Sequence, residues 1–224
     1  MQAPATVLIV DPDGPTRDAI CRLADRMNLA SLAYAQGGEF LRAHQYCQPG
    51  CVVLEVRIPD ASGLQIQSRL NAEGVTIPLV FLTAEANVHV AVRAIRAGAV
   101  HFLEKPARDD ELWDAIEEAI SIDQQRREAR QRQQRLDRQF AGLSIKEERV
   151  FEMIGDGKST REIASELKVS VRAIELRRNS LMKKLDIESP AELVRMAWAA
   201  REGNGAVRRH LNRGLELSRG FSDL

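Results

Sequence analysis

Four polar side chains stand at the ends of short apolar runs in this sequence. Asp11 follows TVLIV, Glu55 follows VVL, Thr83 follows PLVFL, and Lys105 comes two residues after VHFL. Carboxylates and an ammonium group that lie together can form charge-assisted hydrogen bonds, and carboxylate oxygens are ligands that Mg²⁺ prefers. The sequence therefore offers two acids, a hydroxyl and a base that can act together if the apolar runs are neighbouring strands.

The apolar runs alternate with segments of helical periodicity, which indicates a parallel sheet. Strands are expected at residues 6–10, 31–34, 52–54, 78–82 and 100–103. Helices are expected at residues 15–29, near Phe40, from 64 to 70, at 88–97 and from 109 onwards. Right-handed crossovers would cover both faces of this sheet, and the functional crevice of an open α/β sheet lies at the carboxyl ends of its strands. The four polar side chains all fall at that edge.

The composition is that of a globular protein with one large domain or two ordinary ones. The 224 residues are 44% hydrophobic and 29% charged, and 32 Lys and Arg balance 32 Asp and Glu, so the overall charge identifies no partner. The first apolar run has no basic segment before it and is too short to span a bilayer, which predicts a cytoplasmic protein without membrane contact. Cys21, Cys47 and Cys51 fit a reducing compartment. Cys47 and Cys51 are four residues apart and could form a redox pair or half of a metal site, but no second Cys or His cluster completes such a site, so we expect buried or incidental thiols.

The composition changes after residue 121. The stretch DQQRREARQRQQRLDRQ at residues 123–139 is almost wholly polar, and it continues from an apolar stripe that includes Leu112, Ile116 and Ile120. We expect one long helix whose first half packs on the sheet and whose second half is solvated. The solvated half is either a simple spacer or a segment that pairs with its copy in a dimer.

Beyond residue 142 the sequence shows four helix starts and no strand pattern. Capping boxes begin at Ser144, Ser159 and Ser189, and Ser170 is a further N-cap residue. The expected helices are 144–155, 159–167, 170–185 and 189–201. A very short connection joins the second helix to the third, which suggests a helix-turn-helix. The tail at 203–224 is either a short amphipathic helix or, as we favour, a frayed end.

Two sets of motifs follow one another along the chain. The first is VLIVD at 7–11, VRIPDASGL at 56–64, FLTAEA at 81–86 and AIRAGAVHFLEKP at 94–106; the second is LSIKEERVFEMIGDGKSTREIASELKVSVRAIELRRNSLMKKL at 143–185. Together they resemble a bacterial two-component response regulator of the NarL/FixJ subfamily, over residues 5–202. The resemblance implies an α/β fold: a (βα)5 doubly wound, flavodoxin-like parallel sheet forming a receiver at 1–121. It further implies a linker helix at 122–141, an all-α four-helix LuxR-type helix-turn-helix domain at 142–202, and a tail at 203–224.

In this family, two acids after the first strand and an Asp after the third bind Mg²⁺. The Asp is phosphorylated, a Thr or Ser and a Lys contact the phosphoryl group, and an aromatic residue reorients. Asp11 matches the first acid, but Pro12 stands at the position of the second, and Glu55 stands at the phosphoacceptor position. The other matches are Thr83 for the hydroxyl, Lys105 with Pro106 after it for the lysine, and Phe102 for the switch aromatic.

The resemblance therefore implies a degenerate receiver with no required cofactor, in which the Mg²⁺ site left to Asp11 and Glu55 is weak or absent. Asp13 is expected to cap the first helix, and Arg57 to offer only its backbone carbonyl. A Glu side chain reaches about 1.5 Å further than Asp, towards Lys105 and the place of a phosphoryl group. Three interpretations stay open: a fixed, partial imitation of the phosphorylated state, an inert pocket controlled by a partner or a small molecule, and ordinary phosphorylation at Glu55. The missing acid at Pro12 argues against the third.

The second helix of a helix-turn-helix enters the major groove of DNA. Its core face is expected to carry Ile174, Leu181 and Leu185. By similarity to the family, Glu175, Leu176 and Asn179 face the bases, where Asn pairs with adenine, Glu accepts from cytosine and Leu touches a thymine methyl group. The candidates for phosphate contacts are Lys158, Thr160, Arg172, Arg177, Arg178, Lys183 and Lys184.

These features predict a sequence-specific DNA-binding transcription regulator that acts independently of phosphorylation, and not an enzyme. The alternatives are a conventional phosphorelay response regulator and an adaptor controlled by a protein or small-molecule partner. The expected partners are double-stranded DNA with an inverted-repeat operator and a second copy of the chain, at least on DNA, because the last helix pairs two copies in the family. RNA polymerase is a further candidate, and the sequence does not decide whether a histidine kinase acts on the receiver.

Overall fold

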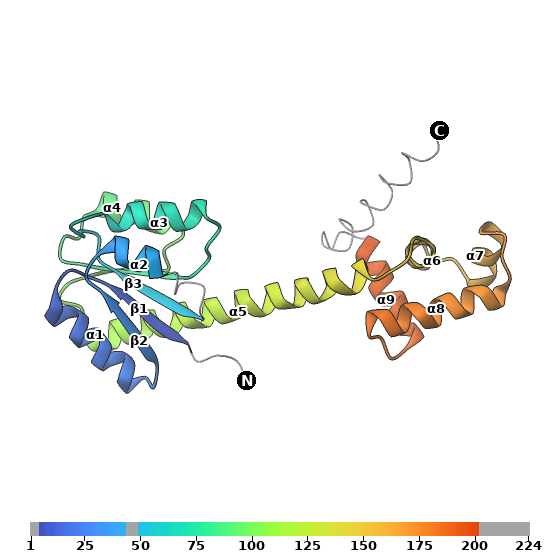
Figure 1. The fold of residues 1–224 in the computed structure, drawn as a ribbon, viewed down its shortest axis with the longest axis horizontal. Helices are drawn as coiled ribbons and strands as arrows, with labels where there is room; N and C mark the ends of the chain where they lie inside the picture. Colours follow the sequence, from blue (N-terminus) through green and yellow to red (C-terminus); the bar gives the residue numbers. More distant parts are fainter. Residues whose placement is uncertain (1–4, 44–48, 202–224) are drawn as a thin grey trace. The chain divides into compact units, whose positions relative to one another are not determined.

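A computed structural model describes residues 5–43 and 49–201 of the chain. These residues contain a parallel sheet of five strands in the order β2-β1-β3-β4-β5 (Figure 1). The strands are β1 (Thr6–Val10), β2 (Ala30–Tyr34), β3 (Gly50–Leu54), β4 (Leu79–Thr83) and β5 (His101–Glu104). The predicted doubly wound α/β fold is confirmed.

β1, β3 and β4 are apolar on both sides because helices cover both faces of the sheet, whereas the edge strand β2 is largely exposed. Successive side chains point to opposite faces, so Val7 and Ile9 join one core whereas Leu8 and Val10 join the other. The first core is covered by α1 (Gly14–Arg26) and the first half of α5 (Asp109–Ala141). The second is covered by α2 (Gly37–Ala43), α3 (Gly63–Ala72) and α4 (Val88–Arg96) (Figure 1).

Two element ends differ from the sequence prediction for reasons of backbone geometry. β3 begins at Gly50, two residues earlier than expected. Gly50 has φ +148°, and a Cβ there would lie 1.9 Å from the carbonyl oxygen of Thr6, so glycine is what allows β3 to start close against β1. The first helix ends at Arg26 because Asn28 adopts the left-handed conformation, with φ +57°.

The long helix α5 is bound to the sheet at the amino-terminal end of β3. The buried carboxylate of Asp123 accepts hydrogen bonds from the backbone nitrogen of Gly50 at 2.9 Å and from Nε of Arg127 at 2.6 Å. Arg126 donates to the carbonyl oxygen of Thr76 at 3.1 Å. Just beyond this anchor the chain divides into two compact units, Met1–Glu128 and Ala129–Leu224.

The second unit is helical and has its own core. It contains α6 (Ile145–Gly155), α7 (Thr160–Glu166), α8 (Val171–Leu185) and α9 (Pro190–Arg201). The predicted N-caps Ser144, Ser159, Ser170 and Ser189 directly precede these four helices. Phe140, near the end of α5, packs edge-to-face on Phe151 of α6 with ring centroids 5.2 Å apart, so the last turns of α5 belong to this core.

The cysteines of the described residues form no disulfide. Cys21 is half-buried and Cys51 is buried in β3. Burial, reinforced by the nearby charge of Asp123, raises the pKa of the Cys51 thiol to about 12. Cys47 and the tail at 203–224 lie outside the described residues.

Candidate functional site

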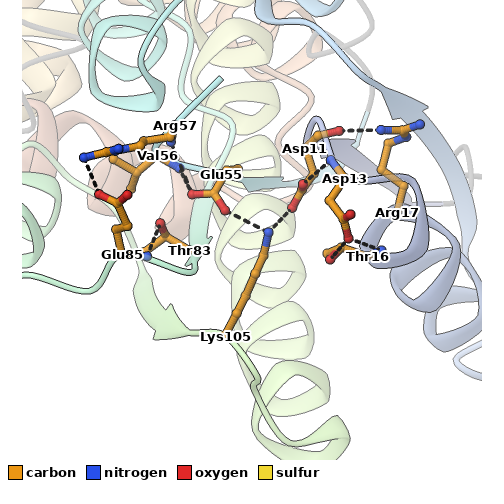
Figure 2. A network of polar contacts seen from close by, with 10 residues as sticks. All are labelled: Asp11, Asp13, Thr16, Arg17, Glu55, Val56, Arg57, Thr83, Glu85 and Lys105. Atoms are coloured by element: carbon orange, nitrogen blue, oxygen red, sulfur yellow. Dashed lines mark hydrogen bonds and ion pairs between the residues drawn. The ribbon is translucent and has the colours of Figure 1, made fainter. Parts of the chain in front are cut away.

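The side chains of Asp11, Glu55, Thr83 and Lys105 meet at the carboxyl edge of the sheet, as Figure 2 shows. Asp11 and Glu55 directly follow the neighbouring strands β1 and β3, Thr83 ends β4, and Lys105 follows β5. Asp11, Glu55 and Thr83 are 2%, 6% and 1% exposed. The structure thus brings together four residues that the sequence places up to 94 positions apart.

Lys105 lies between the two carboxylates of this pocket. Its Nζ is 2.5 Å from Oδ2 of Asp11 and 2.8 Å from Oε2 of Glu55 (Figure 2). Burial, the largest influence, lowers the pKa of Lys105, but the hydrogen bonds and charges of the two carboxylates outweigh it, and the pKa lies above its ordinary value. The lysine is therefore charged at neutral pH, and one ammonium group serves two buried carboxylates.

The carboxylate of Glu55 is shared between the lysine and its own loop. Oε2 faces Lys105, whereas Oε1 turns back and accepts from the backbone nitrogens of Val56 at 2.6 Å and Arg57 at 3.2 Å. Burial, the largest influence, raises the pKa of Glu55. The hydrogen bonds from Lys105, Thr83 and the backbone of Arg57 together outweigh burial, so the pKa lies below its ordinary value and Glu55 is an anion at neutral pH.

Asp11 shows the opposite balance. Burial raises its pKa above the ordinary value, and the charge of Glu55 adds to the rise. The hydrogen bonds from Lys105 and from the backbone nitrogen of Asp13, at 2.9 Å, offset this in part. The two carboxylates compete for the single ammonium group of Lys105, and Glu55 keeps its charge more firmly.

The loop after β1 supplies no further metal ligand. The side chain of Pro12 is exposed and carries no oxygen, and Asp13 caps α1, as predicted, by accepting from the backbone nitrogen of Thr16 at 2.9 Å and its Oγ1 at 2.6 Å. Within residues 5–43 and 49–201, no group of three or more Asp, Glu, His or Cys side chains is placed to hold a metal ion. Mg²⁺ demands near-octahedral oxygen ligands, and both carboxylates of the pocket are bound to the ammonium group of Lys105 in this structure.

The rim of the pocket carries a contact that the sequence did not predict. Arg57 and Glu85 form an exposed ion pair, with Nη2 2.5 Å from Oε2, which joins the loop after β3 to the loop after β4 (Figure 2). Thr83 Oγ1 accepts from the backbone nitrogen of Glu85 at 3.2 Å. The side chain of Arg57, which we expected to offer only its backbone carbonyl, therefore links two loops at the rim of the pocket.

The aromatic residue of β5 points into the core rather than into solvent. Phe102 is half-buried and packs against Phe81 of β4, with ring centroids 5.9 Å apart. Both rings contact the core that α2, α3 and α4 cover.

The loop that carries Glu55 makes close contacts near its carboxyl end. A Cβ on Gly63 would lie 2.4 Å from the carbonyl oxygen of Glu55, so glycine permits α3 to start against that residue. Asp60 accepts from the backbone nitrogens of Gly37 at 2.9 Å and Gly38 at 2.7 Å, at the start of α2. Sequence reasoning missed Asp60, and the pair of glycines that begins α2 was the available signal.

In the second unit, α7 and α8 form the predicted helix-turn-helix. Lys168 in the turn has φ +51°, and Ser170 caps α8 by accepting from the backbone nitrogen of Ala173. The buried residues of α8 are Ile174, Leu181 and Leu185. Away from this core face, Glu175, Leu176 and Asn179 are exposed, and Leu176 is 63% exposed despite its large apolar side chain.

The candidates for phosphate contacts differ in their surroundings. Arg172 and Lys183 are exposed, and Arg177 is half-buried. Three others bind neighbouring side chains: Lys158 is ion-paired with Glu166, Arg178 donates to Oγ1 of Thr160 at 3.4 Å, and Lys184 is 2.7 Å from Oε2 of Glu147.

Comparison with known proteins identifies both units. Residues 7–117 match the family described as "Response regulator receiver domain", and residues 141–197 match "Bacterial regulatory proteins, luxR family". The chain is 34% identical over 193 residues to "Nodulation protein W" of Bradyrhizobium diazoefficiens, which covers 86% of this chain and 85% of that protein. It is 32% identical over 194 residues to "Transcriptional regulatory protein FixJ" of Azorhizobium caulinodans, over 87% and 92% of the two chains. This chain belongs to the response regulators.

Solved structures agree with this membership. The response regulator StyR has a TM-score of 0.83 and 34% identity over 88% of this chain and 100% of its own. Full-length FixJ from B. japonicum has a TM-score of 0.54 and 33% identity over 91% and 100%. This response regulator thus joins a receiver, which implies a kinase partner, to a LuxR-type DNA-binding domain, and it is a transcription regulator, not an enzyme. Across the part of the chain that the structure describes, no helix is long and apolar enough to cross a membrane.

Proposed function

We propose that this response regulator binds a specific DNA sequence and that phosphorylation does not switch its receiver. The observation that carries the second part is the position of Lys105, whose ammonium group lies between Asp11 and Glu55. In phosphoryl transfer, metal ions neutralise the charge on the phosphoryl oxygens. Here the ammonium group of Lys105 lies between the two carboxylates, and phosphorylation of Glu55 would have to break its hydrogen bonds to Lys105 and to its own loop.

The sequence of the pocket supports a degenerate receiver. Glu55 takes the phosphoacceptor position and Pro12 the position of the second acid, so the Mg²⁺ site formed by Asp11 and Glu55 is weak or absent, and no cofactor is required. A metal ion would have to displace Lys105 from both carboxylates. Pro12 removes one carboxylate ligand for Mg²⁺, and Lys105 binds the two carboxylates that remain. Both changes weaken the binding of Mg²⁺.

Glu55 imitates the phosphorylated state in part. It is an anion that hydrogen-bonds with Lys105 and Thr83, the two residues that contact the phosphoryl group in the family. Phe102, at the position of the switch aromatic, packs inward against Phe81. These contacts support a receiver held in one state by its own side chains.

One observation favours a second candidate, control by a protein or small-molecule partner. An open groove beside the Glu55 loop is lined by Pro12, Val56, Arg57, Ile58, Pro59 and Ser62. Four of these six residues are apolar. A partner seated there would contact Val56 and Arg57, whose backbone nitrogens hold the carboxylate of Glu55.

Incubation of the full-length protein with acetyl phosphate tests the proposal, with and without Mg²⁺. We expect no covalent phosphate by mass spectrometry and no change in oligomeric state by light scattering. Mg²⁺-dependent phosphorylation, or a Mg²⁺-dependent shift from monomer to dimer, would restore the conventional phosphorelay alternative.

We infer that the exposed face of α8 contacts DNA. Glu175, Leu176 and Asn179 face the bases, where Glu accepts from cytosine, Leu touches a thymine methyl group and Asn pairs with adenine. Arg172 and Lys183, two exposed positive charges near these side chains, contact phosphates. The 63% exposure of Leu176 supports this assignment, because a large apolar side chain in that position has no role in the core.

We infer that two copies bind an inverted-repeat operator. Val194 and Trp198 of α9 are 42% and 54% exposed, and they lie one turn apart on the side of α9 that the core does not cover. Pairing of two α9 helices buries both residues and places two copies of α8 on DNA with twofold symmetry. RNA polymerase and a cytoplasmic location complete the proposed setting.

Selection of bound duplexes from a random library tests the DNA assignment. The wild type should enrich one inverted-repeat sequence. Arg172→Ala should reduce the slope of log affinity against log salt by about one unit, whereas Arg96→Ala, on the exposed face of α4 in the receiver, should leave that slope unchanged. Failure to enrich any sequence would contradict the proposal.

A further inference from the structure

The carboxylate of Glu147 joins α6 to α8 inside the DNA-binding unit. Its side chain is 8% exposed. Oε1 accepts from Oγ of Ser180 at 2.6 Å, and Oε2 accepts from Nζ of Lys184 at 2.7 Å. Oε2 also accepts from the backbone nitrogen and Oγ of Ser144, both at 2.7 Å. One buried group therefore closes the N-terminus of α6 and holds two side chains of α8.

Ser180 and Lys184 stand one turn apart on α8, next to its proposed base-contacting face. Ser180 is four residues after Leu176, which places it about 40° around the helix from that side chain. On the opposite side of the same face, Arg178 donates to Thr160 of α7 at 3.4 Å. The base-contacting face thus lies between two sets of polar contacts, one to α6 and one to α7.

These polar contacts control the rotation of α8 about its own axis, which the apolar core does not fix. Packing of Ile174, Leu181 and Leu185 is non-directional, whereas hydrogen bonds depend on both distance and angle. A rotation of α8 about its axis would stretch the bonds from Ser180 and Lys184 to Glu147. The core therefore holds α8 in place, and Glu147 sets the angle at which its side chains point outward.

We propose that Glu147 is a positioning residue for base recognition, and that Lys184 acts as its counter-ion and not as a phosphate contact. The inference rests on the proposed DNA-binding face of α8. Burial, the largest influence, raises the pKa of Glu147, but the hydrogen bonds from Lys184, Ser180 and Ser144 outweigh it and lower the pKa to about 2. The carboxylate is therefore ionised at every pH at which the regulator would bind DNA.

Positioning and phosphate contact have different signatures in DNA binding. A phosphate contact adds salt-dependent affinity for any sequence. A positioning residue acts through the base contacts, each of which discriminates between sequences. Loss of positioning should therefore lower the affinity for the operator alone, and it should leave the affinity for other sequences and the salt slope unchanged.

Lys184→Met and its neighbour Lys183→Met form a matched pair in the full-length protein. The probes are a duplex that the wild type selects from a random library and a scrambled duplex of the same composition. We expect Lys184→Met to lower the affinity for the selected duplex about tenfold and to leave the scrambled duplex and the salt slope unchanged. Lys183→Met should weaken binding to both duplexes and reduce the slope by about one unit.

Ser180→Ala is a control for partial unfolding of the Lys184→Met variant. It removes one hydrogen bond to Glu147 without changing charge, and it should lower the ratio of selected to scrambled affinity in the same direction. A partly unfolded variant lowers the bound fraction on both duplexes alike, so this ratio separates positioning from stability. Glu147→Gln, folded at the assay temperature by circular dichroism, should lower the ratio most.

Two results would overturn the inference. In the first, Lys184→Met reduces the salt slope as Lys183→Met does, which makes Lys184 a phosphate contact. In the second, Lys184→Met and Ser180→Ala both leave the affinity ratio unchanged. A different result, in which the wild type selects no sequence and Lys183→Met changes neither affinity nor slope, would overturn the proposed DNA-binding face itself.

Discussion

Glu55 in the receiver and Glu147 in the DNA-binding unit are both buried glutamates that bind a lysine. The Lys105–Glu55 and Lys184–Glu147 ion pairs have nearly the same length, 2.8 and 2.7 Å. Hydrogen bonds lower the pKa of each glutamate against the effect of burial. The two sites differ in the groups that surround the ion pair. This difference determines how evenly the charges of each site are balanced.

Glu147 has a lysine to itself and three further hydrogen bonds from two serines. Glu55 shares Lys105 with Asp11, so its pocket holds two carboxylates and one ammonium group. Burial of unbalanced charge is costly, and the raised pKa of Asp11 reflects that cost. The charges of the receiver pocket are therefore less evenly balanced than those around Glu147.

The largest effect on stability should follow removal of Lys105, because it leaves two buried carboxylates without their counter-ion. We expect Lys105→Met to lower the free energy of unfolding of the receiver by about 3–5 kcal/mol. Without the lysine, the pKa values of Asp11 and Glu55 rise, so the loss should be larger at pH 8 than at pH 5. Urea unfolding followed by Trp113 fluorescence, in a Trp198→Phe background, reports the first unit.

Arg26→Met is the control for this measurement. Arg26 pairs with Asp109 on the surface, where the side chains are 57% and 75% exposed, and its loss should cost no more than about 1 kcal/mol. If both variants were equally mild at both pH values, the ion triad around Lys105 would not be the stabilising feature of the pocket.

The next largest effect should follow Glu147→Gln. A pKa of about 2 in the folded state, below the ordinary value of 4.5, contributes about 3 kcal/mol that is fully present above pH 4.5 and is lost as the pH falls towards 2. The variant should be less stable than the wild type at pH 7, and the difference should shrink below pH 4.5. Trp198 fluorescence in a Trp113→Phe background measures the second unit.

Glu188→Gln provides the comparison, because Glu188 is exposed in the same unit. It should leave the stability at pH 7 within about 0.5 kcal/mol of the wild type. An equal loss in both glutamine variants would mean that the Glu147 network adds nothing specific.

The smallest effects should come from the hydroxyl groups of the two networks. Ser180→Ala should cost about 1.5 kcal/mol, since it removes a hydrogen bond to a charged group. Thr83→Val should cost less, because Glu55 keeps two backbone hydrogen bonds and its lysine. Urea unfolding of both variants checks this order, and a larger loss at Thr83 would reverse our view of which site is the more firmly held.

Periodicity predicted the fold well because β1, β3 and β4 lie between two apolar cores and each of the last four helices begins after a serine cap. The site was predictable where its residues follow strands, as Asp11, Glu55 and Lys105 do. The contacts of Glu147 with α8 were not predictable. The sequence marks Glu147 as part of a capping box, but its carboxylate also accepts hydrogen bonds from Ser180 and Lys184, which lie 33 and 37 residues away in the sequence. Lys184 therefore looked like another surface cation.

The most direct test of the receiver proposal compares the natural pocket with a rebuilt one. Pro12→Asp with Glu55→Asp restores the acids that the family uses for Mg²⁺ and phosphate. Fluorine NMR of fluorophenylalanine-labelled protein, with Phe102→Leu to assign the signal, would follow Phe102 as beryllofluoride and Mg²⁺ are added. We predict that the Phe102 signal shifts in the rebuilt receiver and stays unchanged in the wild type; a Mg²⁺-dependent shift in the wild type would contradict the account.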